Sequence, residues 1–434
     1  MSSSSTAVPA SRAPGDPTPS DLGARRRRHH GLAFWSVAFA FLVVMAFSTA
    51  PSPLYGLYQE RDGFSSFVVT LVYAGYAVGV VGALVFAGHL SDWHGRRRVM
   101  LPAIAVSVLS AIVFLLWRDV PGLVVARILN GISVGVVAAT ATAYLAELHA
   151  VSRPDAGPRH SQLVATAVNL GGLALGPIVS GVLAQWTDRP LSLPYLVFLV
   201  VLVAAIAVVA LAPETRDRLD PLPSYRPQRI SVPAESRSAF SAAALGAFLA
   251  FGVLGLFTGL ASVFLVGTLH HPSHALAGLT LALMFGGGVV AQTLTSSWAL
   301  PRVLAAGTAS MLLGLTLVVV AVWLDTPSLA LFLAGGAFSG AGAGAVFKGT
   351  VGTVAAIAPP ETRAEALAGL FLAGYLGLSV PVVGAGVALQ YASPRATLTG
   401  FALLVGGAIL LAAPRLVRGP RVPTPTGRPA GSPA

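Results

Sequence analysis

Residues 66–117 run SFVVTLVYAGYAVGVVGALVFAGHLSDWHGRRRVMLPAIAVSVLSAIVFLLW, which is two long apolar blocks around a short charged loop. Each block holds about the 20 residues that an α-helix needs to cross the hydrocarbon core of a bilayer. Because lipid offers no hydrogen-bond partners to the backbone, apolar blocks of this length form helices. The stretch therefore predicts two membrane-spanning helices, near 66–88 and 98–117.

Apolar blocks of the same kind recur along the whole chain. Of its 434 residues, 55% are hydrophobic and only 10% are charged, whereas a soluble domain carries about 25% charged residues. The predicted fold class is an all-α membrane protein with 12 transmembrane helices in two six-helix bundles. The ten further spans are expected near 31–50, 121–148, 162–186, 193–212, 240–268, 275–298, 301–323, 327–357, 365–390 and 396–413.

Three polar segments frame the two bundles. We expect 1–30 to be a disordered tail and 213–238, PETRDRLDPLPSYRPQRISVPAESRS, to be an extended linker. A second tail is expected at 414–434, so the bundles occupy 31–212 and 239–413. Pro51-Ser52-Pro53 should break the first span near its far end, because proline cannot continue a helix.

The arginines predict an orientation. With the N-terminus inside, 21 arginines fall in cytosolic segments, and the external loops hold only Arg61, Arg118, Arg189 and Arg395. Cytosolic loops of membrane proteins carry an excess of Arg and Lys. The sequence therefore predicts a multi-pass protein of the cell membrane with both termini cytosolic. The net charge of +11 then favours contact with anionic lipids and not with nucleic acid.

The loop Gly88-His89-Leu90-Ser91-Asp92-Trp93-His94-Gly95-Arg96-Arg97-Arg98 carries the sharpest motif. Gly88 can let two helix ends approach, and Gly95 can adopt the positive φ of a tight turn. Asp92 lies near a helix start, where a carboxylate can cap the helix, and Arg96 can pair with a carboxylate. The loop resembles the signature G-x-L-[AS]-D-x-x-G-R-[RK]-[RK] of the major facilitator superfamily, at the expected place after the second span.

That resemblance implies a mechanism and a set of residues. In the family, two six-helix bundles rock about a central cavity, and a charge cluster at this loop latches the outward-open state. The resemblance therefore implies a conformational latch made of Gly88, Asp92, Gly95, Arg96 and Glu147. For Glu147, at the end of the fourth span, a solvated helix-end glutamate is the alternative.

The fourth span, Arg127-Ile-Leu-Asn130-Gly131-Ile-Ser-Val-Gly135, is similar to the family's pattern of a buried Arg followed by spaced glycines. Gly131 and Gly135 also match Gly340 and Gly344 of the tenth span, which suggests repeated halves.

The fifth span resembles the motif G-x-x-x-G-P-x-x-G-G of the antiporter branch, in Gly172, Gly176, Pro177 and Gly181, with Ser180 replacing one glycine. The alternative is a close-packed helix pair without a role in export. Pro213-Glu214-Thr215 is another common family ending of the sixth span. The second half departs from the pattern, since LTSSWALPR at 294–302 lacks the Asp and Gly of a second loop signature.

Ionisable and polar side chains inside the spans are the candidates for binding a substrate or coupling ion. Lys348, the only lysine, could bind an anion, cycle a proton, or extend to the cytosolic interface. The candidates are Lys348, Arg127, Asn130, Asn169, Tyr375 and Gln292, with Tyr55 and Ser379 as further polar residues. No acidic residue is expected near the midplane, so proton coupling would need Asp92, Glu147, Lys348 or the substrate.

These features predict a secondary transporter that exports an apolar or amphipathic small molecule. Import of a metabolite by the same fold is the alternative, and a non-transporting membrane sensor is the alternative of another class. We expect no enzymatic activity, because no paired carboxylates or nucleophile with its base occur in the spans. No cofactor or metal is expected, and the anticipated partners are a small molecule, possible coupling protons and anionic lipids around a monomer.

Overall fold

The computed structural model describes residues 19–221, 233–359 and 362–417. The parts of the expected tails and linker at 1–18, 222–232 and 418–434 lie outside the described residues.

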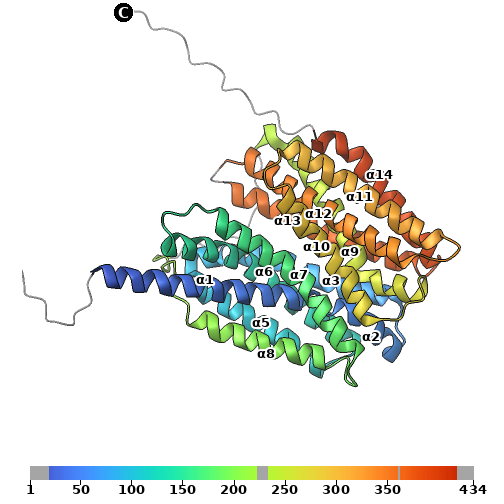
Figure 1. Ribbon diagram of the computed structural model, residues 1–434, viewed down its shortest axis with the longest axis horizontal. Coiled ribbons are helices and arrows are strands. Elements are labelled where there is room, and N and C mark those ends of the chain that lie inside the picture. Colours follow the sequence, from blue (N-terminus) through green and yellow to red (C-terminus); the bar gives the residue numbers. More distant parts are fainter. Residues whose placement is uncertain (1–18, 222–232, 360–361, 418–434) are drawn as a thin grey trace, which may run out of the picture.

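Twelve helices among the described residues are long and apolar enough to cross a membrane, which confirms the predicted number of spans. Figure 1 shows them in two groups, coloured blue to green for the first half and yellow to red for the second. The first half contains α1 (Pro19–Thr49), α3 (Ser66–Ala87), α5 (Arg96–Leu116), α6 (Val120–Ser152), α7 (Arg159–Gln185) and α8 (Leu193–Ala210). The second half contains α9 (Arg237–Gly267), α10 (His274–Leu294), α11 (Leu300–Trp323), α12 (Leu329–Ile357), α13 (Arg363–Ala388) and α14 (Pro394–Val417).

The expected disorder at 19–30 is wrong, because α1 begins at Pro19. Proline is favoured in the first helical turn, and arginine is a strong helix former. The helix therefore continues beyond the apolar block, into polar residues that hydropathy assigns to a tail. Likewise α9 begins at Arg237, inside the expected linker, and α14 extends to Val417, inside the expected second tail.

The predicted proline break after the first span is confirmed. Helix α1 ends at Thr49, and η1 (Ser52–Leu54) and α2 (Tyr55–Asp62) follow it. A second short helix, α4 (Leu90–His94), forms within the loop after the second span. Hydropathy did not predict α2 or α4, since both are too short and polar to cross a bilayer.

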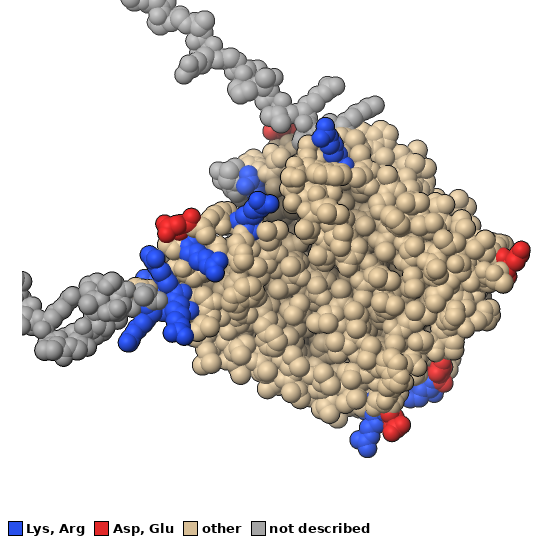
Figure 2. Space-filling view, in the orientation of Figure 1, with Lys and Arg blue, Asp and Glu red and all other residues tan. Residues whose placement is uncertain are grey.

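Charged side chains mark the two ends of the helices. Figure 2 shows them at opposite ends of the visible face, with an uncharged band between. We name these the Asp92 end, where α3 leads into α4, and the Asp62 end, where α2 leads into α3. Because twelve helices alternate in direction, α1 begins and α14 ends at the same end, the Asp92 end.

Glycines let the second and fourth spans of each half pack backbone to backbone. A Cβ built on Gly131 of α6 would overlap the carbonyl oxygen of Tyr76 on α3. A Cβ on Gly340 of α12 would overlap the carbonyl oxygen of Met284 on α10 in the same way. In lipid, helix association depends on such close contact, because apolar surface gains little by leaving an apolar solvent. The glycines that match between the halves thus hold equivalent helix pairs.

Substitution of Gly131 by Ala should therefore destabilise the protein. The added methyl must push α3 and α6 apart, at about 1–3 kcal/mol for overpacking. Gly82→Ala on α3 is the matched control, because nothing lies within 4 Å of its added Cβ. The thermal midpoint of the purified protein in detergent should fall for Gly131→Ala alone. Equal midpoints for the two variants would contradict the packing argument.

Candidate functional site

The two halves meet closely at the Asp62 end, where α7 packs on α10. A Cβ on Gly181 of α7 would overlap the carbonyl oxygen of His274, and a Cβ on Gly278 of α10 would overlap that of Pro177. Beside this crossing, the Gln185 side-chain oxygen accepts a hydrogen bond from the backbone N–H of His274 at 2.9 Å. The two backbones are therefore in contact, with no room for a ligand between them.

A second contact between the halves involves α3. The hydroxyls of Tyr73 on α3 and Thr258 on α9 are hydrogen-bonded at 2.5 Å. Nearer the Asp62 end, Thr70 of α3 is fully buried, and its side chain would block a Cβ on Gly386 of α13. Together with α7 and α10, these helices close the Asp62 end of the molecule.

A cavity of about 370 Å³ lies between the halves. Its lining includes Leu84 in the last turn of α3 and Thr142 in the second half of α6. Both lie on the Asp92 side of the contacts just described, so the cavity extends from mid-membrane toward the Asp92 end. The first half contributes Ser48, Tyr73, Tyr76, Arg127 and Asn169, and the second half contributes Phe251, Phe285, Gln292, Phe347, Phe371 and Tyr375.

Arg127 is the one charged side chain among the described residues that line this cavity. It is 1% exposed and donates from Nη1 to the carbonyl oxygen of Ser48 at 2.7 Å. Its guanidinium carbon lies 4.7 Å from the Tyr76 ring centroid and 5.5 Å from that of Tyr73. The Nε–H is buried and has no partner within the described part of the chain.

Aromatic rings form the facing wall, on the second half. Phe347 of α12 lies 5.0 Å from Phe251 and 5.6 Å from Phe371, measured between ring centroids. Tyr375 adds a ring 5.5 Å from Phe251. Edge-to-face pairs of this kind hold the rings in place. The cavity thus combines one buried cation on one side with a fixed apolar surface on the other.

The structure places some of the predicted substrate candidates in the cavity wall and others outside it. Arg127, Asn169, Gln292 and Tyr375 line the cavity. Asn130 does not, although it is fully buried and neither amide atom has a partner among the described residues. The buried hydroxyls of Tyr55 and Ser379 also lack partners there.

Lys348 is not among the residues that line the cavity, and its side chain extends to the end of α10 at the Asp92 end. Its Nζ donates to the carbonyl oxygen of Gln292 at 2.8 Å and to the hydroxyl of Thr295 at 3.3 Å. Both acceptors lie at the C-terminal end of α10, where unpaired carbonyl groups and the helix dipole favour a cation. The lysine therefore holds α12 to the end of α10.

The loop after the second span forms a charge cluster around Arg96. Arg96 donates to Glu147 from Nε at 3.1 Å and from Nη2 at 2.9 Å, and Nη2 lies 2.8 Å from an Asp92 oxygen. Nη1 donates to Ser91 at 2.8 Å. Arg96 is only 5% exposed, so removal of one carboxylate would leave a buried charge poorly compensated. The structure thus brings together Asp92, Arg96 and Glu147.

Glu214 belongs to this cluster, although its sequence motif gave no role to it. Its carboxylate accepts from the backbone N–H groups of Arg96, Arg97 and Arg98 at 2.7, 3.3 and 3.3 Å. It thereby caps the N-terminus of α5, where four N–H groups lack helical partners. Thr215 donates to Glu147 at 2.6 Å. The Pro213-Glu214-Thr215 motif was the available signal, but sequence gave no partner for it.

Other details of the loop differ from expectation. Gly95 has φ +101°, as predicted, and a Cβ there would lie 2.6 Å from a Glu214 oxygen. The predicted capping by Asp92 is wrong, because α4 has no side-chain cap; Asp92 pairs instead with Arg96 and with Arg216, at 3.2 Å. Gly88 has φ −58°, which any residue can adopt.

Every partner given above for the cluster comes either from the first half or from Glu214, Thr215 and Arg216 at the start of the expected linker. Among the described contacts, the loop does not join the two halves in this conformation.

The small residues of the fifth span serve two contacts. A Cβ on Gly172 would lie 2.6 Å from the carbonyl oxygen of Leu42, and one on Gly176 would overlap that of Ala46. These positions pack α7 on α1 within the first half. Pro177 and Gly181, farther along the helix, face α10 of the second half. One motif therefore links α7 both to its own half and to the opposite one.

Two six-helix halves around a central cavity, closed at one end, define a membrane transporter and not an enzyme. The family model described as "Major Facilitator Superfamily" matches residues 37–302, which is more than half of the chain. The protein belongs to the major facilitator superfamily.

Curated relatives match parts of the chain. It is 33% identical over 92 residues to the arabinose-proton symporter of Bacillus subtilis, which covers 21% of this chain and 20% of that protein. It is 31% identical over 144 residues to the cephamycin export protein CmcT of Amycolatopsis lactamdurans, covering 31% of this chain and 29% of that one. The matches therefore span less than a third of either relative.

Solved structures share the fold over nearly the whole chain. A bacterial homologue of the human lysosomal transporter Spinster has a TM-score of 0.68 at 13% identity, covering 91% of this chain and 99% of that one. A POT family transporter in complex with 5-aminolevulinic acid has a TM-score of 0.72 at 12% identity, covering 90% and 96%. At these identities the similarity shows the fold alone.

Substitution of Lys348 by Met should lower stability and leave substrate binding intact. The change removes charged hydrogen bonds to the end of α10, worth about 1–3 kcal/mol, from a site outside the cavity. The thermal midpoint in detergent should fall, while the dissociation constant of a transported compound stays within about twofold. A tenfold weaker affinity at an unchanged midpoint would instead place Lys348 in the binding site.

Substitution of Gly181 by Leu should open the Asp62 end. A packing cost of about 1–3 kcal/mol would shift a two-state equilibrium by about five- to 150-fold. The chain contains no cysteine, so Thr70→Cys gives a single reporter at the buried contact between α3 and α13, also at the Asp62 end. Alkylation of this cysteine by a maleimide should be faster in the Gly181→Leu background. Gly171→Leu on the same helix is the control, since its nearest neighbour lies 3.9 Å from the added Cβ. Equal labelling in both variants would contradict the assignment.

Proposed function

We propose that this transporter exports an apolar or amphipathic small molecule across the cell membrane by alternating access. The observation that carries the proposal is the cavity between the halves, with an aromatic wall opposite one buried guanidinium. A site of this kind suits a molecule with a flat apolar body and one hydrogen-bond acceptor. The apolar body would lie against Phe251 and Phe347, and the acceptor would lie near the guanidinium of Arg127.

The proposed orientation places the Asp92 end in the cytosol, because the arginine excess gathers in the loops of that end. In this orientation the structure is inward-facing: the cavity extends toward the cytosol and the external end is closed. An exported compound would then enter from the cytosol or from the inner leaflet.

The switch to an outward-facing state requires that the contacts at the Asp62 end separate. Gly181 would move away from α10, and the Tyr73–Thr258 hydrogen bond would break. At the same time the Asp92 end would close. We propose that the cluster of Asp92, Arg96 and Glu147 then meets the second half and stabilises that state, as the family's latch does. Arg96 is already held by three partners within the first half. Its side chain would therefore need little rearrangement to make the contact with the second half.

The proposal leaves few groups to carry a coupling proton. No Asp or Glu occurs among the described residues that line the cavity. A coupled proton would therefore use Asp92 or Glu147 at the cytosolic end, or would travel on the substrate. Protonation of Asp92 or Glu147 would change the charge of the latch itself. Proton binding would then be coupled directly to the conformational change.

Four observations bear on the direction of transport. The fifth-span motif and the partial match to a cephamycin export protein support export. The partial match to an arabinose-proton symporter favours import of a polar metabolite, which remains the second candidate. The aromatic wall supports the first, because a sugar needs several polar partners, and the second half offers few of them to the cavity.

Energised cells lacking the gene distinguish direction and latch in one experiment. Re-expression of the wild-type chain should lower the steady-state accumulation of an amphipathic aromatic dye severalfold, and Asp92→Asn should behave like the empty vector at equal expression. Arg98→Gln is the matched control, since that arginine is exposed on the same loop and should retain activity. Higher accumulation with the wild-type chain would show import, and full activity of Asp92→Asn would contradict the latch.

A further inference from the structure

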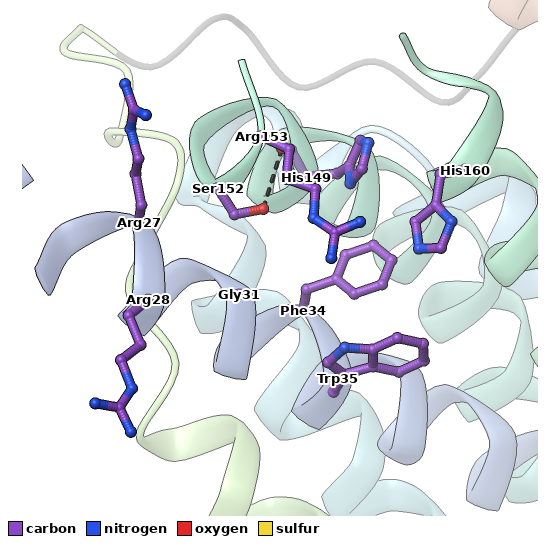
Figure 3. Close-up of a pocket in the computed structure, with 9 residues that line it drawn as sticks. All are labelled: Arg27, Arg28, Gly31, Phe34, Trp35, His149, Ser152, Arg153 and His160. Atoms are coloured by element: carbon purple, nitrogen blue, oxygen red, sulfur yellow. Dashed lines mark hydrogen bonds between the residues drawn. The ribbon is translucent and has the colours of Figure 1, made fainter. Parts of the chain in front are cut away.

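A second pocket, of about 250 Å³, lies at the Asp92 end, outside the central cavity. Figure 3 shows it between α1, the end of α6 and the start of α7. Its walls combine basic and aromatic side chains, and they come from the first half alone: Arg27, Arg28, Gly31, Phe34, Trp35, His149, Ser152, Arg153 and His160. The α1 extension that hydropathy missed contributes Arg27 and Arg28.

The pocket concentrates positive charge without compensation. In Figure 3 the Arg153 guanidinium points between the Phe34 ring and His160, while Arg27 and Arg28 extend to either side of α1. No carboxylate lines the pocket, and none of these three arginines belongs to an ion pair between described residues. His160 lies in the first turn of α7, where the helix dipole also favours an anion.

His149 is an unsatisfied polar group inside this pocket. Its side chain is 3% exposed, and its Nε2 has no hydrogen-bond partner in the described part of the chain. Its ring centroid is 5.8 Å from that of Phe34 and 5.3 Å from that of His160. An unpaired buried nitrogen is costly. A ligand oxygen could accept its N–H in one tautomer.

The surface beside the pocket is apolar. Trp35 is 57% exposed, and Phe39, one helical turn further along α1, is 39% exposed. Leu163, three residues after His160 on α7, is 46% exposed. These side chains lead from the pocket toward the uncharged band of the molecule. Exposed Trp is typical of the membrane–water interface, so the pocket lies at headgroup depth with an acyl-chain surface below it.

We propose that this pocket binds the phosphate group of an anionic phospholipid. Arg153, His160 and His149 hold the phosphate oxygens, with Arg27 and Arg28 adding attraction, and the acyl chains lie along Trp35, Phe39 and Leu163. The apolar surface assigns the phosphate to a lipid and not to a soluble anion. Because all these residues lie on α1, on α7 or at the end of α6, the lipid contacts the first half only.

Binding of short-chain phosphatidylglycerol to the purified full-length chain tests the site by native mass spectrometry. Loss of one charged hydrogen bond costs about 1.5–3 kcal/mol, so Arg153→Gln should weaken binding by about tenfold or more, and His160→Gln should also weaken it. Arg302→Gln is the matched control, because that arginine is exposed at the same end on α11. The lipid-free thermal midpoints should agree, since Arg153, His160 and Arg302 are exposed.

Phosphatidylcholine and inorganic phosphate complete the experiment. The site predicts weaker binding of zwitterionic phosphatidylcholine, and inorganic phosphate should not displace the lipid at equal concentration. Equal loss of affinity in Arg153→Gln and Arg302→Gln would overturn the pocket in favour of diffuse surface charge. Equally tight binding of phosphatidylcholine would overturn the preference for anionic lipid, and equally tight binding of inorganic phosphate would overturn the lipid assignment. None of these outcomes depends on transport.

Discussion

The crossing of α7 and α10 is the contact on which the rest of the structure depends. Gly181 faces the backbone of α10 and Gly278 faces the backbone of α7, so two helices from different halves touch without side chains between them. Lipid gives little hydrophobic drive to hold such helices together. Contact this close is therefore available only where both sides lack a Cβ. It closes the Asp62 end and leaves the cavity accessible from the Asp92 end.

The two halves pack their second and fourth spans in the same way, but they stabilise the loop after the second span differently. In both, a glycine of the fourth span lies against a carbonyl of the second span. In the first half, Arg96 is then enclosed by Asp92, Glu147 and Ser91, and Glu214 caps the following helix. In the second half no such cluster was expected, since LTSSWALPR lacks its residues. Hydrogen bonds from Lys348 to Gln292 and Thr295, and from Gln292 to Gly344, join α12 to the end of α10 there. The charge-rich loop, and with it the proposed latch, belongs to one half.

Much of the fold could be predicted, because span length and proline placement are local properties of sequence. Gly95 was predictable for the same reason, since a tight turn needs a positive φ. Which way a residue faces was not predictable. Both lipid and helix neighbours are apolar, so a span such as α8 carries no polar face that marks its buried side. Asn130 and Lys348 were therefore candidates for the cavity by chemistry alone, and neither is among the residues that line it.

Long-range partners were the other missing information. Glu214 lies far along the chain from the N–H groups of Arg96 and Arg97 that it caps, and no spacing rule connects them. The basic pocket has the same origin, because Arg28 and Arg153 line one pocket only when α1 extends beyond its apolar block. In each case the residues were visible as motifs or charges, but their neighbours required the packed bundle.

Distances between spin labels at the two ends test the central claim of alternating access most directly. The cysteine-free chain accepts one pair at exposed positions of the Asp62 end, Asp188→Cys with His271→Cys, and one pair at the Asp92 end, Asp155→Cys with Arg302→Cys. We predict that Gly181→Leu lengthens the first distance and shortens the second, and that the same fraction of molecules shows both changes. Distances that stay fixed at both ends, or that lengthen together, would contradict it.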